Sequence, residues 1–206
     1  MAYTLYSMDG SGGFAVEAAL VKAGADFQLV AVDTSKGEQN KPEFVAINPM
    51  RQVPTLKLPD GIVMTESAAI VVHLADRFPD KGLGPKAGTP AHAQFLRWMF
   101  FMATNIYESD LRYFYSDRYT TDPAGAPAVK AAGAAHMKKA FAVLDDTLTR
   151  APFLCGSAMT MADVYLAMLL DWSPEPIASP RLQAITRAAA GDPKIAPLWK
   201  RHGFKQ

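Results

Sequence analysis

Residues 46–70 read AINPMRQVPTLKLPDGIVMTESAAI, and this stretch decides the fold. Proline, aspartate and glycine at positions 59–61 form a turn signal between two short apolar runs. They therefore predict two strands, over 55–58 and 62–64. Residues 67–78 predict a helix, because their apolar side chains recur every three or four positions. The order within the stretch is strand, strand, helix.

The residues before this stretch predict a strand, a helix and a second strand. Tyr3 to Ser7 is rich in β-forming residues, and a glycine-rich loop at residues 10–13 ends it. Residues 14–23 are rich in alanine and stop before Gly24, which suits a helix C-cap. Residues 27–32 predict the second strand. The order βαβ followed by ββα predicts a small mixed sheet with helices packed on it.

The rest of the chain predicts a second domain made of helices. Helices are expected over 91–115, 126–150 and 161–172. A stretch rich in proline, glycine and lysine precedes them and is typical of a linker. We predict an α/β domain over 1–79 and an all-helical domain over 90–206, joined by a linker over 80–89.

Composition excludes several classes of protein. The chain has 206 residues, with 21 Lys and Arg against 20 Asp and Glu, so no basic excess favours nucleic acid. Its single cysteine, Cys155, excludes an internal disulfide framework and is interpreted as a buried structural thiol. No apolar stretch reaches the ~20 residues of a membrane span, and no secretory signal opens the sequence. We expect a cytoplasmic protein that binds neither membranes nor nucleic acid.

Familiar catalytic constellations are missing from the sequence. The four histidines are scattered without metal-ligand spacing, so no metal site is expected; they are His73, His92, His136 and His202. The glycine-rich loop lacks the full nucleotide-binding fingerprint. Thr160 to Asp163 fits a capping box, whose role is in folding.

Three local features could nevertheless bind a ligand. Ser11 lies in the turn before the first helix, where a hydroxyl and the helix dipole would stabilise a thiolate; the turn alone favours a simple helix cap. Pro54 directly precedes a strand, where either a cis bond or an ordinary trans proline fits. Glu66 and Ser67 begin a helix and could bind an amino-acid head group, although these residues taken alone clearly favour a simple capped helix.

Together these features resemble the cytosolic glutathione S-transferase family, with serine-type or beta/zeta-like bacterial members nearest in pattern. The family's NP-x-x-QVP-x-L and ES-x-A-I motifs match residues 48–56 and 66–70. Phe153 to Gly156 and the Thr160 capping box match its staple and capping box in the helical domain. The resemblance implies a thioredoxin-like N-terminal domain followed by an all-helical C-terminal domain, usually paired as a homodimer.

The resemblance also assigns roles in binding glutathione, the expected co-substrate. Val53 would pair with the cysteinyl unit through its backbone, and Pro54 would be cis. Glu66 and Ser67 would hold the γ-glutamyl end. The glycine carboxylate would contact Arg51, with Lys36 a weaker candidate, and Gln52 would assist. Only the resemblance to the family motif assigns these binding roles.

The group that activates the thiol is less closely specified. We rank Ser11 first as the catalytic residue, with the amides of Gly12 and Gly13 as helpers and Tyr6 as the alternative. The residues after Ser11 depart from the family pattern. The second-substrate pocket would lie between the first-strand turn and the long aromatic helix, although such residues are more often core. Its candidate residues are Tyr6, Met102, Tyr107, Leu111, Phe114 and Trp172.

The predicted function is a glutathione transferase that conjugates small hydrophobic electrophiles in detoxification, without a metal. One alternative is a glutathione-dependent isomerase or dehalogenase, since residues 48–57 resemble the zeta-like isomerases, although their Ser-Ser-Cys turn is absent. Another alternative is a non-catalytic glutathione-binding stress protein. The absence of cysteine from the turn disfavours chemistry through a mixed disulfide.

Overall fold

A computed structural model describes residues 2–205 of the chain. The chain divides into two compact units, which are described separately below. The first unit contains residues 1–87 and also the C-terminal residues 189–206. The second unit contains residues 88–188.

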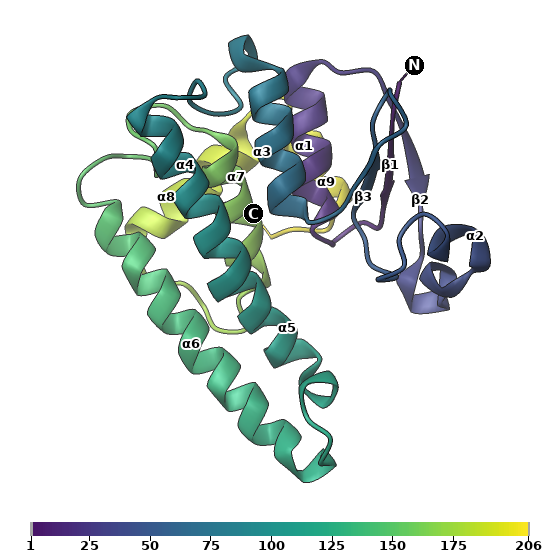
Figure 1. Cartoon of the computed structure of the whole chain (residues 1–206). Coiled ribbons are helices and arrows are strands. Elements are labelled where there is room, and N and C mark those ends of the chain that lie inside the picture. Colours follow the sequence, from purple (N-terminus) through teal and green to yellow (C-terminus); the bar gives the residue numbers. More distant parts are fainter. Residues whose placement is uncertain (1, 206) are drawn as a thin grey trace. The chain divides into compact units, whose positions relative to one another are not determined.

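The first unit contains a four-stranded sheet in the order β2-β1-β3-β4 (Figure 1). Strands β1 (Tyr3–Ser7) and β2 (Phe27–Ala31) are parallel, and helix α1 (Gly13–Ala23) connects them. Strand β3 (Thr55–Lys57) runs antiparallel to β1, and β4 (Val63–Met64) runs antiparallel to β3. This topology confirms the predicted βαβ–ββα order.

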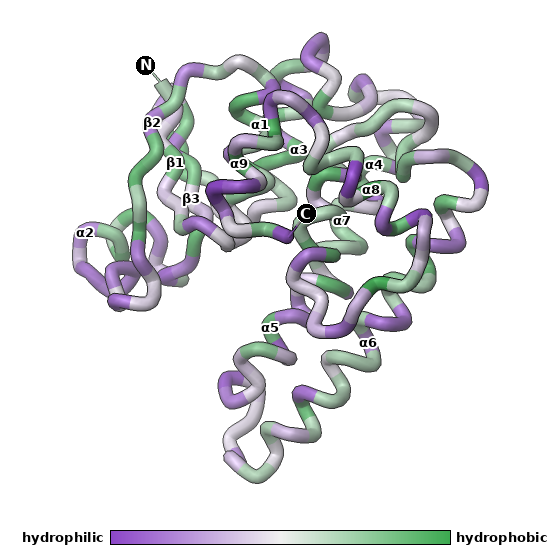
Figure 2. The backbone as a smooth tube through the Cα atoms, turned by 180° about the vertical axis from the view of Figure 1, so that it is seen from behind, coloured by the Kyte–Doolittle hydropathy of each residue, from purple (hydrophilic) through white to green (hydrophobic). Residues whose placement is uncertain are grey.

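Helices α1 and α3 (Ser67–Arg77) lie side by side against one face of this sheet (Figure 1). The face they cover is the one on which β1 buries Tyr3, Leu5 and Ser7, since alternate residues of a strand point to opposite faces. The short helix α2 (Pro42–Val45) lies beyond β2. In Figure 2, β2 is mostly hydrophobic, whereas the loop over residues 33–43 is hydrophilic. The arrangement is thioredoxin-like, as the resemblance implied.

The C-terminal segment differs from the predicted domain boundary. Residues 189–206, including α9 (Ala196–Arg201), belong to the first unit, although the helical domain was predicted to extend to residue 206. The physical reason is an aromatic cluster, in which the rings of Trp199 and Phe204 pack edge-on against Phe14 of α1 at centroid distances of 5.5 and 4.7 Å. Burial of these rings stabilises the segment on α1.

The second unit is helical throughout its regular elements. Helix α7 is the most buried of them, because residues 161–170 are all buried. Figure 1 shows α6 running alongside α4 and α5. The helices are α4 (Pro90–Phe101), α5 (Glu108–Phe114), α6 (Ala126–Thr147), α7 (Met161–Trp172) and α8 (Pro180–Gly191), whose last residues extend into the first unit.

The helix predicted over 91–115 contains a π-helical segment, η4 (Met102–Tyr107), between α4 and α5. Polar side chains explain the departure. Thr104 Oγ1 donates to the Phe100 carbonyl at 2.9 Å, and Asn105 Nδ2 donates to the Phe101 carbonyl at 3.0 Å. These donors compete with backbone N–H groups for carbonyls four residues earlier, a common cause of irregular helix geometry.

The capping box predicted at Thr160 begins α7. Asp163 is fully buried, and its Oδ2 accepts from the Thr160 N–H at 2.8 Å. Its Oδ1 accepts from the Leu154 N–H at 2.8 Å, which attaches the preceding loop to the helix. Among residues 2–205, none of the helices combines the length and hydrophobicity that crossing a membrane requires.

Candidate functional site

Three predicted site segments meet at one edge of the sheet. The register pairs Tyr6 with Thr55, so the start of β3 lies beside the end of β1. Helix α1 begins just after the end of β1. The register also pairs Leu56 with Met64, so α3 begins at the same edge, just after β4. The topology therefore brings together the turn at residues 8–13, the loop at 48–54 and the start of α3.

In the turn, the Ser11 hydroxyl already makes two hydrogen bonds. Its single hydrogen is donated to the Met8 carbonyl at 2.6 Å, and its oxygen accepts from the Gly13 N–H at 3.2 Å. The Ser11 N–H also donates to the Met8 carbonyl, at 3.2 Å. Ser11 therefore holds the turn together, since its hydroxyl joins the Met8 carbonyl to the N–H of Gly13, the first residue of α1.

The two glycines after Ser11 have different tasks. Gly13 is needed for close packing, because a Cβ there would lie 1.8 Å from Ser7 Oγ. Gly12 is the N-cap of α1, with φ −58° and ψ −10°. Within residues 2–205, the Gly12 N–H makes no hydrogen bond. It lies at the positive end of the α1 dipole and so offers a donor to an anion.

A buried asparagine orders the loop before β3. Asn48 is 2% exposed, and its Nδ2 donates to the Gln52 carbonyl at 2.9 Å and to Thr55 Oγ1 at 3.0 Å. Its Oδ1 accepts from the Met50 N–H at 3.0 Å. The sequence analysis quoted Asn48 within the motif but assigned it no role. Its side chain fixes the loop that carries the predicted binding residues.

That loop presents an unpaired peptide edge. The Val53–Pro54 bond is cis, which confirms the expectation for Pro54. Val53 is half-buried, and among residues 2–205 its N–H and carbonyl make no hydrogen bonds. Gln52 and Arg51 are exposed, and Arg51 adopts a positive φ of 57°. Lys36 forms an ion pair with Asp33 at 2.9 Å, which leaves Arg51 as the better anion contact.

The start of α3 presents an exposed carboxylate, that of Glu66, whose Oε1 accepts from Thr65 Oγ1 at 3.4 Å. Glu66 is the N-cap residue with φ 64° and ψ 101°, a conformation that costs ~1–3 kcal/mol in a non-glycine residue. Its side chain is exposed and does not cap the helix. Ser67, the first residue of α3, is 7% exposed. The residue that precedes α3 therefore combines a strained backbone with an exposed carboxylate.

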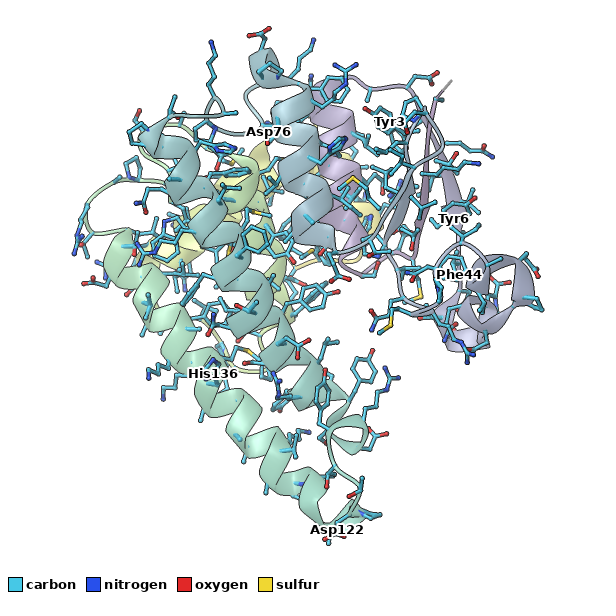
Figure 3. The ribbon with its side chains drawn as sticks, viewed as in Figure 1. Tyr3, Tyr6, Phe44, Asp76, Asp122 and His136 are labelled. Carbon is cyan, nitrogen blue, oxygen red and sulfur yellow. The ribbon has the colours of Figure 1, made fainter. Side chains whose placement is uncertain are left out.

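The structure puts Tyr6 on the other face of the sheet. Its ring packs edge-on to Phe44 of α2 at a centroid distance of 5.9 Å (Figure 3). The two rings line a hollow of about 360 Å³ with residues of β2 and the α2 region. This hollow shares no lining residue with the predicted glutathione-binding set. The geometry therefore favours Ser11 and Gly12 over Tyr6 as the groups near the thiol.

The other five candidates for the second-substrate pocket belong to the second unit. Trp172 and Tyr107 are in edge-on contact at a centroid distance of 5.3 Å. Phe114 is 54% exposed, whereas Met102 is fully buried and therefore lies in the core. Leu111 is half-buried on α5. A pocket joining these residues to Tyr6 stays a prediction.

Cys155 is a half-buried thiol in the loop before α7. Burial and the nearby Asp163 carboxylate raise its pKa to about 11, despite a hydrogen bond with Thr160. It is therefore protonated at neutral pH and a poor nucleophile. This agrees with its interpretation as a structural thiol.

Comparison with known families identifies two regions of the chain. Residues 1–76 match the family model described as "Glutathione S-transferase, N-terminal domain". Residues 127–187 match "Glutathione S-transferase, C-terminal domain". The first match contains all three segments of the candidate site.

Relatives and solved structures extend the similarity over most of the chain. Glutathione S-transferase GstA of Escherichia coli O157:H7 is 31% identical over 82% of this chain and 81% of its own. The uncharacterized GST-like protein YncG of Escherichia coli K12 is 30% identical over 96% and 97%. A Sulfitobacter glutathione transferase homologue with bound glutathione is 26% identical, with a TM-score of 0.89 over 99% of both chains. A sphingomonad glutathione S-transferase complexed with glutathione is 29% identical, with a TM-score of 0.83 over 98% and 100%.

Proposed function

We propose, from the premise that this chain belongs to the glutathione S-transferase family, that its sheet edge binds glutathione and ionises the thiol. The chain is a glutathione transferase. The observation that carries the assignment of residues is the convergence of hydrogen-bonding groups at this edge. The N–H of Gly12 and the peptide edge of Val53 are unused among residues 2–205. The carboxylate of Glu66 is exposed and, within the same residues, accepts only from Thr65 Oγ1, at 3.4 Å.

Each part of the tripeptide finds a complementary group in this proposal. The Glu66 carboxylate accepts from the ammonium of the γ-glutamyl end, and Ser67 with the start of α3 binds its carboxylate. Val53 pairs with the cysteinyl unit through its N–H and carbonyl. The guanidinium of Arg51 binds the glycine carboxylate, and Gln52 assists.

The thiol is activated by the turn. A free cysteine thiol has a pKa of about 8.5, so only a few per cent is thiolate at neutral pH. The N–H of Gly12 donates to the sulfur, and the positive end of α1 stabilises its charge. Both interactions favour the thiolate, whose proton passes to solvent. The thiolate then attacks the electrophilic carbon of the second substrate, and with an aryl halide the new C–S bond replaces the carbon–halogen bond as halide leaves. Ser11 acts as a positioning residue, because its hydroxyl fixes the turn that aims the N–H of Gly12.

The wider setting is also part of the proposal. The second substrate is a small hydrophobic electrophile, supported by the exposed ring of Phe114 and the contact between Tyr107 and Trp172. We place the enzyme in the cytoplasm as a homodimer acting in detoxification, in line with the family resemblance. No metal ion takes part in the proposed reaction.

Calorimetric titration of glutathione into wild type and Glu66→Ala tests this assignment. The Kd should rise about tenfold to a hundredfold in the variant, because a charged hydrogen bond is lost. The pKa of the bound thiol should change little, since Glu66 contacts the opposite end of the tripeptide. Glu43→Ala is the matched control, because it removes an exposed carboxylate from α2 in the same unit.

Two results would contradict the proposal in different ways. Wild-type protein that fails to bind glutathione, or fails to conjugate it to an aryl halide, would remove the transferase function. Equal affinity in wild type and Glu66→Ala would remove only the role of Glu66.

A further inference from the structure

His202 is a buried residue that the proposed reaction does not use. It follows α9 in the C-terminal segment that belongs to the first unit. Its side chain has no exposed surface. Its ring lies edge-on to Phe14, the second residue of α1, at a centroid distance of 5.2 Å. The imidazole therefore sits against the beginning of the helix whose N-terminus faces the thiol in the proposed function.

Both ring nitrogens of His202 make hydrogen bonds that fix its tautomer. The Gly10 N–H donates to Nδ1 at 3.1 Å, so Nδ1 carries no hydrogen. The ring hydrogen is therefore on Nε2, which donates to Glu17 Oε2 at 3.1 Å. The imidazole thus links α1 to the turn that precedes it.

Three charged groups surround Nε2, and the two carboxylates among them favour a hydrogen on that nitrogen. Arg201 forms ion pairs with Glu17 and with Asp9, and its guanidinium lies 3.0 Å from His202 Nε2. Asp9 Oδ1 is 3.4 Å from Nε2. Burial raises the pKa of the Glu17 carboxyl, but the hydrogen bonds from His202 and Arg201 outweigh burial and lower it. Glu17 therefore stays ionised and accepts from Nε2.

His202 accepts from Gly10, and the backbone conformation of Gly10 shapes the turn. Gly10 has a φ of 76°, which side-chain-bearing residues rarely adopt, and it immediately precedes Ser11. The inner hydrogen bonds of the turn join Ser11 to Met8. The bond from Gly10 to His202 ties the same turn to a residue 192 positions away.

We propose that His202 is a positioning residue for thiol activation. By accepting the Gly10 N–H, its Nδ1 fixes the turn that aims the Gly12 N–H at the glutathione sulfur. The inference rests on the proposed function, because it adds a support for the same thiolate site. Its chemistry is that of a neutral imidazole acting as an acceptor toward backbone, without contact to the substrate.

Simple docking of the C-terminal segment is the competing explanation for His202. A second set of contacts between this segment and α1, at the C-terminal end of the helix, allows an experiment to distinguish the two explanations. There Lys22 forms an ion pair with Asp192 at 2.6 Å, and Lys194 Nζ donates to the Lys22 carbonyl at 3.2 Å. Asp192→Asn weakens the docking of the same segment far from the turn, so it is a matched control.

The experiment measures the pKa of bound glutathione from its thiolate absorbance in wild type, His202→Gln, His202→Asn and Asp192→Asn. Glutamine carries its amide nitrogen near the place of Nε2, so it keeps the bond to Glu17 and loses the acceptor for Gly10. Asparagine carries its amide oxygen near the place of Nδ1, so it keeps that acceptor. Circular dichroism verifies that each variant folds.

The thiol pKa should rise by about 0.5–1 unit in His202→Gln and stay near wild type in the other two variants. At a pH below that pKa, kcat should fall roughly threefold to tenfold in His202→Gln, in proportion to the thiolate fraction. KM for glutathione should not change, because the groups that bind its ends lie elsewhere.

If the thiol pKa is lowered in wild type and equally lowered in folded His202→Gln, the role of His202 is overturned, but the proposed function is not. A wild-type thiol pKa that is not lowered would overturn the proposed activation, and this inference with it. If the His202 variants fail to fold, the ¹⁵N chemical shift of His202 Nδ1 in wild type, measured with and without glutathione, tests the inference instead. A change in that shift on adding glutathione supports the inference, and an unchanged shift contradicts it.

Discussion

Asp110 in α5 is 3% exposed, and neither of its carboxylate oxygens has a hydrogen-bond partner among residues 2–205. Burial raises its pKa to about 8, compared with about 3.9 in an unfolded chain. Between these two values the folded protein binds the proton and the unfolded chain does not. The free energy of unfolding therefore falls as pH rises from about 4 to about 8 through this group.

Replacing Asp110 by asparagine should remove this pH dependence. At pH 8 the free energy of unfolding of Asp110→Asn should exceed that of wild type by several kcal/mol, on the order of 5, because each unit between the folded and unfolded pKa values costs wild type about 1.4 kcal/mol. Below pH 4 the two proteins should be equally stable. Urea unfolding across this pH range measures the difference. Asp117→Asn, which changes an exposed carboxylate in the same unit, is the control. A stability difference that does not grow with pH would contradict the assignment.

Candidate binding residues could be proposed one by one where a local motif contains them. Pro54 belongs to such a motif, and its expected cis bond is confirmed. The role of Ser11 stays a prediction, and the orientation of its hydroxyl could not be predicted, because a hydroxyl rotates toward the nearest acceptor. Asn48 went unassigned, since the three partners of its side chain become neighbours only when the loop closes.

At the scale of the element, the loop before α7 depends on one carboxylate. Asp163 accepts from the N–H groups of Leu154 and Thr160 and from the Thr160 hydroxyl, all within 3.0 Å. Asp163→Ala leaves these buried donors unsatisfied, so the free energy of unfolding should fall by about 2–4 kcal/mol. Denaturant unfolding measures the loss.

The control for this prediction is Asp146→Ala, near the end of α6. Asp146 is exposed and forms a loose ion pair with Arg150 at 3.8 Å, so its loss should change stability by less than about 0.5 kcal/mol. Equal effects of the two substitutions would contradict the role of the capping box.

Elements with strong periodicity were predicted closely, and irregular ones were not. The ends of α7 agree with prediction to the residue, because a capping box begins it and apolar residues fill it. The π-helical segment η4 interrupts a helix that composition alone reads as continuous. Thr104 and Asn105 cause the interruption, and the choice between solvent and a backbone carbonyl for such side chains depends on packing.

At the scale of the molecule, the sequence predicted two parts but not the return of the chain to the first. The C-terminal segment packs on α1 through aromatic rings, and His202 reaches the turn from the far end of the chain. Neither interaction leaves a periodic pattern in the sequence. Contacts between residues so distant in the chain depend on tertiary packing, which local propensity does not encode.

In the proposed function, ionisation of the glutathione thiol depends on the Gly12 N–H. One measurement tests this role most directly. Thiolate absorbance gives the pKa of bound glutathione in wild type, Gly12→Ala and Gly12→Pro. Proline suits the φ of −58° and removes the N–H, whereas alanine keeps the N–H and controls for the added Cβ. We predict a pKa below about 8.5 in wild type and Gly12→Ala, and a rise of about one unit in Gly12→Pro. An equal, lowered pKa in all three folded proteins would contradict the account.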